Sequence, residues 1–362
     1  MELYYYTTTE TMRYILSEGN IFATNMKYMN DSEEYLNGLK EVRDYILHAE
    51  NEFKSSAEKK LSEEVYLDWR EREVNSFSIS FTTARDLLSQ WSMYAKESGV
   101  SLKMEFENKD YKFLAYNGKG KKCVNYHMRP QEVYYFTKEV LSEREYNQTG
   151  KKIVEKMKEQ FEQKGMMDYD DNIIQLWLGI APFVKRADFG AEKEYRLVFE
   201  FNNSKSFIPR VDFRNEGSVI KPYLDISLRE GWPVTEIVVG PGFNQNAVFD
   251  SISYFLSKGQ IKVPPISLRK MSERIREYFH NIEEVAGTTK KNELLDEWEE
   301  KYSNFAKDNP KNDRDTIKSL YNEFNAFIER KGNEGMLQGY IRNNFLSLSG
   351  IILRKSKIPY IY

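Results

Sequence analysis

The sequence predicts an α+β fold with a mainly antiparallel sheet, and three patterns carry this prediction. Residues 76–82 and 195–201 alternate between apolar and polar side chains, which indicates strands with one buried face. Strands and helices follow one another without regular β-α-β alternation, which disfavours a doubly wound parallel sheet. Residues 271–346 carry apolar side chains at helical spacing, which predicts a helical block near the C-terminus.

The chain begins with a predicted strand over residues 3–9, which are rich in Tyr and Thr. Thr9 is expected to cap a helix that runs to about Glu18, and Gly19 is expected to end it. The next elements are expected in this order: a strand over 20–24, a turn at 29–32, a helical segment over 32–74, a strand over 76–82, a helix through 87–94 and a strand over 100–106. Beyond them we expect a loop at 118–122, helices over 151–164 and 172–184, strands over 195–201 and 236–239, a helix over 246–257 and a strand over 261–263.

The helical block is interpreted as an insertion between two strand candidates, at residues 266–270 and 352–355. The second candidate is expected to complete the main sheet. This reading divides the chain into an α+β core domain, residues 1–270 plus 347–362, and a helical insertion, residues 271–346. The apolar stripes of the insertion predict a small helical core, and Asp313 or Asp315 is expected to cap its second helix.

Composition excludes several kinds of chemistry. Basic and acidic residues nearly balance, at a formal net charge of −3, so global attraction to nucleic acid or an anionic membrane is not indicated. A single cysteine, Cys123, forms no intrachain disulfide and no cysteine-based zinc site. The three histidines show no ligand spacing, and no metal site is expected. The N-terminus lacks a signal-peptide pattern and no apolar run is long enough to span a bilayer, so we expect a cytoplasmic protein without a membrane partner.

The most suggestive local sequence is Glu192-Lys193-Glu194-Tyr195-Arg196, at the start of the predicted strand over 195–201. On a strand, Glu192 and Glu194 project to the same side, and Arg196 continues that side and holds one carboxylate ionised. The alternative is a solvated edge of an ordinary amphipathic strand. Ser76, Ser78 and Ser80 likewise form a row of hydroxyls opposite an apolar face, and the alternative here is a solvated strand face.

A Ser-x-Ser strand after an opening strand-and-helix unit, followed later by a Glu-x-Glu strand, is the order of motifs in ADP-ribosyltransferases. The chain resembles that family in this order. Its opening, Tyr-Tyr-Thr-Thr followed by a helix, Gly19 and Ile21-Phe22-Ala23, also resembles members that modify DNA or RNA. The resemblance implies a central sheet that is split around a cleft for NAD, with Glu194 binding the ribose hydroxyl next to nicotinamide.

A nearer resemblance rests on five separated motifs that occur in order. They are Asn30-Asp31-Ser32-Glu33-Glu34, Gln90-Trp91-Ser92-Met93-Tyr94-Ala95, Gly99-Val100, Glu192-Lys193-Glu194-Tyr195-Arg196 and Ser356-Lys357-Ile358-Pro359-Tyr360. In these motifs the chain resembles the bacterial family known as domain of unknown function 2971. The resemblance covers roughly residues 3–270 and 347–362 and leaves out the helical insertion.

The transferase resemblance implies an NAD-consuming effector, in a toxin or in antiviral defence, that transfers ADP-ribose to a macromolecule, either protein or nucleic acid. Glu194 would stabilise the positive charge that develops on the ribose, and Glu192 would orient or deprotonate the acceptor. The residues implied to contact NAD are Tyr6, Thr7, Asn30, Asp31, Ser80, Trp91, Tyr94 and Arg196. Trp91 or Tyr94 would stack on the nicotinamide, although Trp91 also fits a core anchor, and Asn30-Asp31 also fits a structural turn.

Two alternatives remain open. The first strand offers Tyr4, Tyr5, Tyr6 and Thr7 where the transferases carry a His or Arg, and this favours a non-catalytic sensor of a nucleotide derivative in the same cleft. In that reading the helical insertion binds a protein partner. The other alternative is a nuclease that uses Asp31, Glu34 and Glu194 around a divalent ion, and the lack of a compact acidic triad argues against it.

Overall fold

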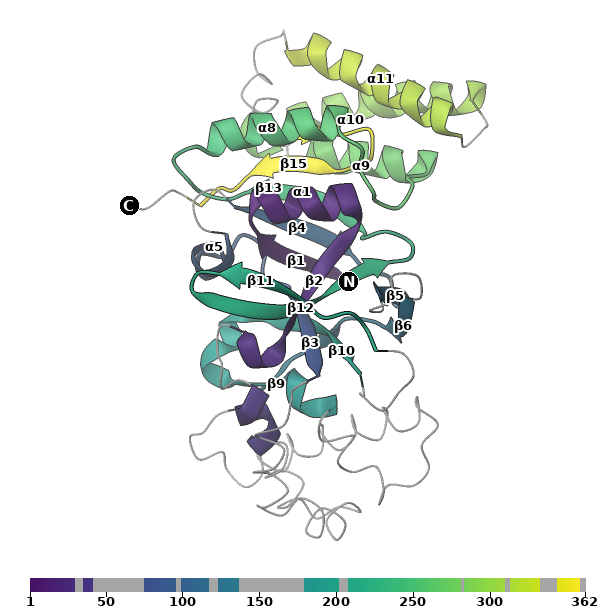
Figure 1. The fold of residues 1–362 in the computed structure, drawn as a ribbon. Coiled ribbons are helices and arrows are strands. Elements are labelled where there is room, and N and C mark those ends of the chain that lie inside the picture. The colour runs from purple at the N-terminus through teal and green to yellow at the C-terminus, as the bar shows by residue number, and fades with distance from the viewer. Residues whose placement is uncertain are drawn as a thin grey trace, which may run out of the picture. The chain divides into compact units, whose positions relative to one another are not determined.

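Figure 1 shows the fold of the protein as a computed structural model. The structure describes residues 1–29, 35–41, 75–95, 99–116, 123–136, 179–201, 208–280, 283–309, 313–332 and 344–358. The chain forms two compact units: unit 1 comprises Met1–Asn20, Ala84–Asn108 and Glu230–Tyr362, and unit 2 comprises Ile21–Thr83 and Lys109–Arg229. Each unit combines segments that lie far apart in the sequence, and each is described by itself.

Within unit 1, strands follow the order β14-β15-β13-β4-β1. These strands are β1 (Glu2–Thr7), β4 (Val100–Glu105), β13 (Val234–Val239), β14 (Asn344–Leu346) and β15 (Ile352–Lys355). Neighbours in this order run antiparallel except β13 and β15, which run parallel. The α+β class with a mostly antiparallel sheet is therefore confirmed, and residues 352–355 join the sheet as the sequence predicts.

The first helix, α1 (Thr9–Glu18), follows β1 directly. Its N-cap is Thr8 and not Thr9, because the Thr8 hydroxyl accepts a hydrogen bond from Thr11 N at 3.2 Å. Gly19 ends the helix as predicted, with φ at 78°, a left-handed conformation that glycine adopts without steric cost.

Two further helices of unit 1 lie close to their predicted positions: α5 (Leu88–Tyr94) and α8 (Gln245–Lys258). α8 packs on β13 and β15. The strand expected over 261–263 is wrong, since no strand forms there. Instead Lys262 N donates a hydrogen bond to Leu16 O at 2.7 Å, which satisfies a carbonyl near the end of α1.

The helical block consists of α9 (Leu268–His280), α10 (Glu283–Asp308) and α11 (Arg314–Gly332). The predicted stripes meet in one core whose buried aromatic members are Tyr278, Phe279, Trp298, Phe305, Phe324 and Phe327. Thr316 N donates to Asp313 Oδ1 at 2.8 Å. Of the two candidates, Asp313 and Asp315, it is therefore Asp313 that caps α11. The strand expected over 266–270 is wrong, because the Ser267 hydroxyl accepts from Lys270 N at 3.2 Å and α9 begins there. The boundaries proposed for a helical insertion, 271–346, stay a prediction.

The short strand β14 ends the sheet of unit 1, and two tyrosines of the helical block cover its carbonyl groups. The Tyr278 hydroxyl of α9 donates to Asn344 O at 3.4 Å, and the Tyr321 hydroxyl of α11 donates to Leu346 O at 3.1 Å. An edge strand that exposes such groups is a template for pairing with another chain. The hydroxyls occupy two of these acceptors.

Unit 2 is also a mainly antiparallel sheet, with the order β10-β3-β2-β12-β5-β6. Its strands are β2 (Asn20–Asn25), β3 (Ser76–Thr82), β5 (Tyr111–Tyr116), β6 (Cys123–Met128), β10 (Glu194–Glu200) and β12 (Val219–Leu228), with β11 (Asp212–Glu216) beside β12 and β7 (Gln131–Glu132) beside β10. A parallel pair, β8 (Tyr134–Phe136) and β9 (Val184–Arg186), forms a separate small sheet. The apolar faces of β3 and β10 are largely buried as predicted, but their polar faces are buried too, so the expectation of a single buried face is wrong.

Several expected elements lie wholly or mostly outside the described residues: the turn at 29–32, most of the helical segment over 32–74, the loop at 118–122 and the helix over 151–164. The helix expected over 172–184 is α-helical at its first described residues, 179–180, but its expected end at 184 is wrong. Ala181–Phe183 is a short 3-10 helix and Val184 begins β9. Pro182 lacks the amide hydrogen that an α-helix needs at an interior position.

Candidate functional site

The pairing of β3 with β10 brings the two hydrophilic faces predicted from the sequence together. In the antiparallel register Thr82 lies opposite Glu194, Ser80 opposite Arg196, and Ser78 opposite Val198. Residues that lie directly opposite one another in such a pair project to the same face of the sheet. The hydroxyl row of β3 and the Glu194/Arg196 side of β10 therefore share one face in unit 2, which is polar except at Val198.

Glu194 is held on this face by two cations. Arg196 Nε donates to Glu194 Oε1 at 2.7 Å, and the Arg196 terminal nitrogen donates to Oε2 at 2.9 Å. This two-point geometry is the strongest form of a carboxylate–guanidinium pair. Lys185 Nζ from β9 adds a third hydrogen bond to Oε2 at 3.1 Å. Glu194 is 4% exposed and Arg196 is fully buried.

Glu192 contacts the same lysine, but a different element positions it from the strand that we expected. It lies at the end of a 3-10 helix, η3 (Ala187–Glu192), and Lys193 follows in a left-handed conformation with φ at 44°. The expectation that Glu192 and Glu194 share one strand is therefore wrong. Both carboxylates nevertheless meet at Lys185, whose Nζ lies 2.9 Å from Glu192 Oε2. We call Lys185, Glu192, Glu194 and Arg196 the Glu194 cluster.

The surroundings of Glu194 keep it ionised. Burial raises the pKa of its carboxyl group, but the charges of Arg196 and Lys185 outweigh that effect and lower the pKa to about 2. Glu194 N also donates to the Tyr135 hydroxyl at 2.8 Å, and burial raises the pKa of Tyr135 to about 12. Near neutral pH the cluster thus holds an ionised carboxylate beside a neutral phenol.

Only some hydroxyls of the β3 row form hydrogen bonds with other described groups of the protein. The Ser76 hydroxyl donates to Glu200 Oε1 at 3.0 Å, and the Thr82 hydroxyl donates to Glu192 O at 2.5 Å. The Ser78 and Ser80 hydroxyl oxygens are buried and have no hydrogen-bond partner of ordinary geometry among the described residues. Ser80 still lies near enough to Glu194 to help lower its pKa.

The predicted nucleotide contacts of β1 and α5 lie in unit 1 and are described separately. The Tyr6 hydroxyl donates to Ala84 O at 3.1 Å and accepts from Leu87 N at 3.0 Å. The rings of Tyr6 and Trp91 meet edge to face, with their centroids 4.7 Å apart. Trp91 is 3% exposed, Tyr94 packs beside it, and Thr7 is buried.

Asp86 organises this region, although no sequence motif pointed to it. Its Oδ1 atom accepts hydrogen bonds from Trp91 Nε1 at 2.8 Å and from the Ser356 hydroxyl at 2.6 Å. Its Oδ2 atom accepts one from Lys357 N at 3.2 Å. Asp86 thus ties α5 to the C-terminal segment, and two of the five sequence motifs, those around Trp91 and Ser356, meet at its carboxylate.

The structure therefore divides the predicted site residues. Glu192, Glu194, Arg196 and Ser80 gather in unit 2, whereas Tyr6, Thr7, Trp91 and Tyr94 gather in unit 1. Asn30, Asp31 and Glu34 lie outside the described residues. Sequence reasoning missed Lys185, and the available signal was one lysine at the end of the largely apolar stretch 180–184.

The described part of the chain contains neither a metal-binding group of side chains nor a membrane-spanning helix. No group of three or more His, Cys, Asp or Glu side chains is arranged to hold a metal ion there. No helix in that part is both long and apolar enough to cross a membrane.

Comparison with known proteins gives one match. The model of the family described as "Protein of unknown function (DUF2971)" matches residues 90–197. This range contains most of α5 and the residues Lys185, Glu192, Glu194 and Arg196. No curated protein and no solved structure matches the chain. Over this stretch, which is less than half of its length, the chain is similar to the DUF2971 family.

Proposed function

We propose that this chain is an ADP-ribosyltransferase-like effector of a toxin or antiviral-defence system, which works in the cytoplasm and transfers ADP-ribose from NAD to a protein or nucleic acid. The proposal includes the split-sheet fold and the bacterial origin that the sequence resemblances imply. One observation supports it above the others: the register of β3 and β10 sets the serine hydroxyls and the Glu194 carboxylate on one face.

The chemistry follows from the charge of Glu194. Cleavage of the nicotinamide–ribose bond builds positive charge on the sugar, and a buried carboxylate with its pKa near 2 is ionised to stabilise it. In the described conformation both Glu194 oxygens accept hydrogen bonds from Arg196, and one also accepts from Lys185. Binding of a ribose hydroxyl to Oε2 in this proposal requires Lys185 to withdraw toward Glu192, while Arg196 keeps the carboxylate in place.

Binding without turnover is the second candidate, and the charge balance of the Glu194 cluster favours it. Two carboxylates face two cations, so the cluster has no formal net charge, and every member is at least nine-tenths buried. Such a neutral set presents less electrostatic stabilisation to a developing cation than an unpaired carboxylate does. In this reading the same face binds a nucleotide derivative and performs no chemistry.

The experiment compares the wild type with two variants. Protein and lysate are incubated with NAD labelled in the adenylate and in the nicotinamide, and both transferred label and released nicotinamide are measured. Glu194→Gln removes the proposed carboxylate. Glu236→Gln is the matched control, because Glu236 of β13 is also buried and is also paired with two cations, Arg85 and Arg354, at 3.0 and 3.1 Å.

Nicotinamide release or label transfer by the wild type and by Glu236→Gln, but not by Glu194→Gln, supports the transferase. Saturable NAD binding without release, weakened by Glu194→Gln alone, supports the binding protein. Equal behaviour of all three proteins, or no interaction with NAD, would contradict both candidates. Circular dichroism of each variant separates loss of function from loss of fold.

A further inference from the structure

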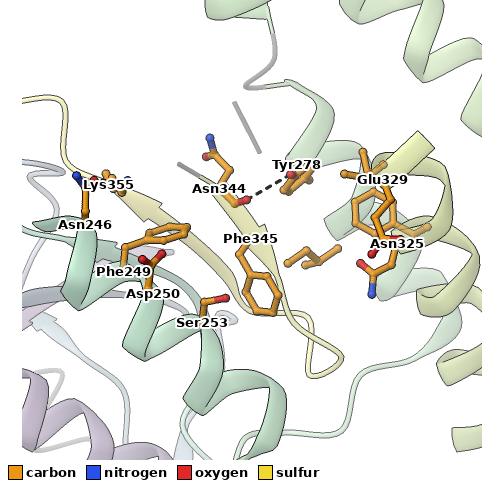
Figure 2. A pocket seen from close by; sticks show the side chains of 13 residues that line it. Asn246, Phe249, Asp250, Ser253, Tyr278, Asn325, Glu329, Asn344, Phe345 and Lys355 are labelled. Carbon is orange, nitrogen blue, oxygen red and sulfur yellow. Dashed lines mark hydrogen bonds between the residues drawn. The ribbon is translucent and has the colours of Figure 1, made fainter. Parts of the chain in front are cut away.

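Unit 1 contains a pocket that is distinct from the Glu194 cluster and from the region around Asp86 (Figure 2). Its volume is about 800 Å³, which falls within the range of small-molecule sites in proteins. α8 supplies one wall, α9 and α11 supply the other, and β14 and β15 lie between them. The pocket thus wraps around the edge of the sheet at β14.

The register of the edge strands explains why the floor of this pocket is apolar. Phe345 lies opposite Leu353, so its side chain is on the face of the sheet that carries Lys355 and that α8 covers. Figure 2 shows the Phe345 ring between the α8 side chains and those of α11. The other apolar lining residues, which are buried, are Phe249, Tyr278, Phe324, Ile328 and Leu346.

One end of the pocket already holds an ammonium group. Lys355 Nζ lies 4.9 Å from the centroid of the Phe249 ring and donates to Asn246 Oδ1 at 2.7 Å. A cation over an aromatic face gains electrostatic attraction from the ring quadrupole. The Phe249 face and the Asn246 amide oxygen therefore already bind one cation on the α8 wall of the pocket.

Two carboxylates lie on the facing walls, Asp250 on α8 and Glu329 on α11. Both carboxylates are exposed, and among the described residues neither forms a hydrogen bond or a salt bridge. Lys355 is engaged by Asn246 and is also attracted by the charge of Asp250. The lining therefore carries two negative charges against one positive charge. Aromatic side chains, amides and an excess of carboxylate are complementary to a positively charged ligand with an apolar body.

We propose that this pocket is a binding site for a small organic cation, with the apolar body of the ligand against Phe345 and its ammonium or amidinium group between Asp250 and Glu329. This inference does not rest on the proposed ADP-ribosyl transfer, because it involves neither NAD nor any residue of the Glu194 cluster. It assigns to the helical block a part in forming a ligand site together with α8.

The test uses three probes with similar apolar bodies and different charges: 2-phenylethylammonium, 2-phenylethanol and 3-phenylpropionate. Binding to the full-length protein is measured by titration calorimetry and by ligand-observed NMR. We expect the ammonium to bind most tightly and the carboxylate least tightly, with about a tenfold difference between them, the factor that corresponds to 1.4 kcal/mol.

Variants locate the site. Asp250→Asn with Glu329→Gln is expected to weaken ammonium binding about tenfold. The matched control is Asp296→Asn with Glu300→Gln, which removes two exposed carboxylates of α10 that do not line the pocket. Glu329→Lys, an exposed substitution on α11, provides a second readout and is expected to favour 3-phenylpropionate over the ammonium.

Three results would overturn the proposal. One is equal affinity for all three probes, and another is unchanged ammonium binding in a folded Asp250→Asn/Glu329→Gln protein or in Glu329→Lys. The third is the absence of saturable ammonium binding at millimolar concentration in the wild type. None of these results bears on NAD turnover, so the two proposals fail separately.

Discussion

The guanidinium of Arg196 holds the carboxylate of Glu194 by two hydrogen bonds, at 2.7 and 2.9 Å, from a position two residues along the same strand. Arg196 Nη1 also donates to Pro182 O at 2.5 Å, so the guanidinium is held by the backbone as well as by Glu194. Removing one partner of a buried ion pair leaves an uncompensated charge, which costs more than the net value of the pair itself.

Glu194→Gln is therefore expected to destabilise the protein strongly. The buried Arg196 guanidinium and the Lys185 ammonium lose the charge that balances them, and the expected loss is about 3–5 kcal/mol in the free energy of unfolding. Urea titration followed by circular dichroism measures this loss. Glu216→Gln is the surface control, because the Glu216 side chain is 50% exposed where it pairs with Lys221 and Arg214. We expect it to change stability by no more than about 1 kcal/mol. Similar effects of the two substitutions would contradict the prediction.

The same carboxylate predicts how stability depends on pH. Its folded pKa of about 2 lies below the ordinary value of 4.5, so ionised Glu194 stabilises the folded state. This contribution is fully present above pH 4.5 and is lost as the pH falls from 4.5 toward 2. The difference corresponds to about 3 kcal/mol, at 1.36 kcal/mol for each pKa unit.

The measurement compares urea midpoints of the wild type and Glu194→Gln from neutral pH down to about pH 3. The difference in urea midpoint between the wild type and Glu194→Gln should be constant above pH 4.5 and should become smaller below it. Acid destabilisation will remain in the variant, because the charges of Arg274 and Lys103 overcome the effect of burial and lower the pKa of Glu105 to about 2 as well. A gap that does not change with pH would contradict the assignment to Glu194.

Strand patterns were the most informative part of the sequence. The polar/apolar alternation of β3 and β10 gave their positions and the orientation of their apolar side chains. It did not reveal that the opposite, polar faces are buried as well. The sequence did not reveal that Glu192 lies outside the strand. Lys193 adopts a positive φ, which is uncommon for a residue other than glycine and has no signal in composition or periodicity.

Sequence reasoning missed residues whose role depends on contacts outside the regular spacing of one helix or strand. Lys185 meets Glu192 and Glu194 only because β9 is brought beside η3 and the start of β10. Asp86 joins Trp91 to Ser356, a residue 270 positions further along the chain. Periodic patterns report on single helices and strands, whereas such contacts are set by how separate elements pack together.

Asp86 provides a third prediction. Its three hydrogen bonds hold α5 and the C-terminal segment, and its φ of 55° is a left-handed conformation that Asn and Asp tolerate better than most residues. Asp86→Asn keeps the backbone preference and one acceptor oxygen, so we expect it to cost about 1 kcal/mol. Asp86→Ala loses both acceptor oxygens, all three hydrogen bonds and the conformational preference, and we expect it to cost about 3 kcal/mol or more.

The indole N–H resonance of Trp91 in a nitrogen-15 NMR spectrum reports directly on this contact. It should move toward the position of a non-hydrogen-bonded indole in Asp86→Ala and stay nearly unchanged in Asp86→Asn. The chain has five tryptophans, so the resonance is assigned by comparison with Trp91→Phe. An unchanged Trp91 signal in a folded Asp86→Ala protein would show that the contact does not exist in solution.

The last prediction concerns the edge of the sheet in unit 1. Tyr278→Phe and Tyr321→Phe remove only the hydroxyls that cover the Asn344 and Leu346 carbonyl groups, and each substitution should cost about 1 kcal/mol, the usual net value of one hydrogen bond. Tyr254→Phe on α8 is the control, because that side chain is 69% exposed. With both hydroxyls absent, in the Tyr278→Phe/Tyr321→Phe double variant, amide hydrogen exchange of residues 344–346 should accelerate more than that of residues 236–239 in β13. The reason is that an edge strand can open without the opening of an interior strand. Equal acceleration in the two strands would mean that the tyrosines stabilise unit 1 as a whole and do not specifically protect its edge.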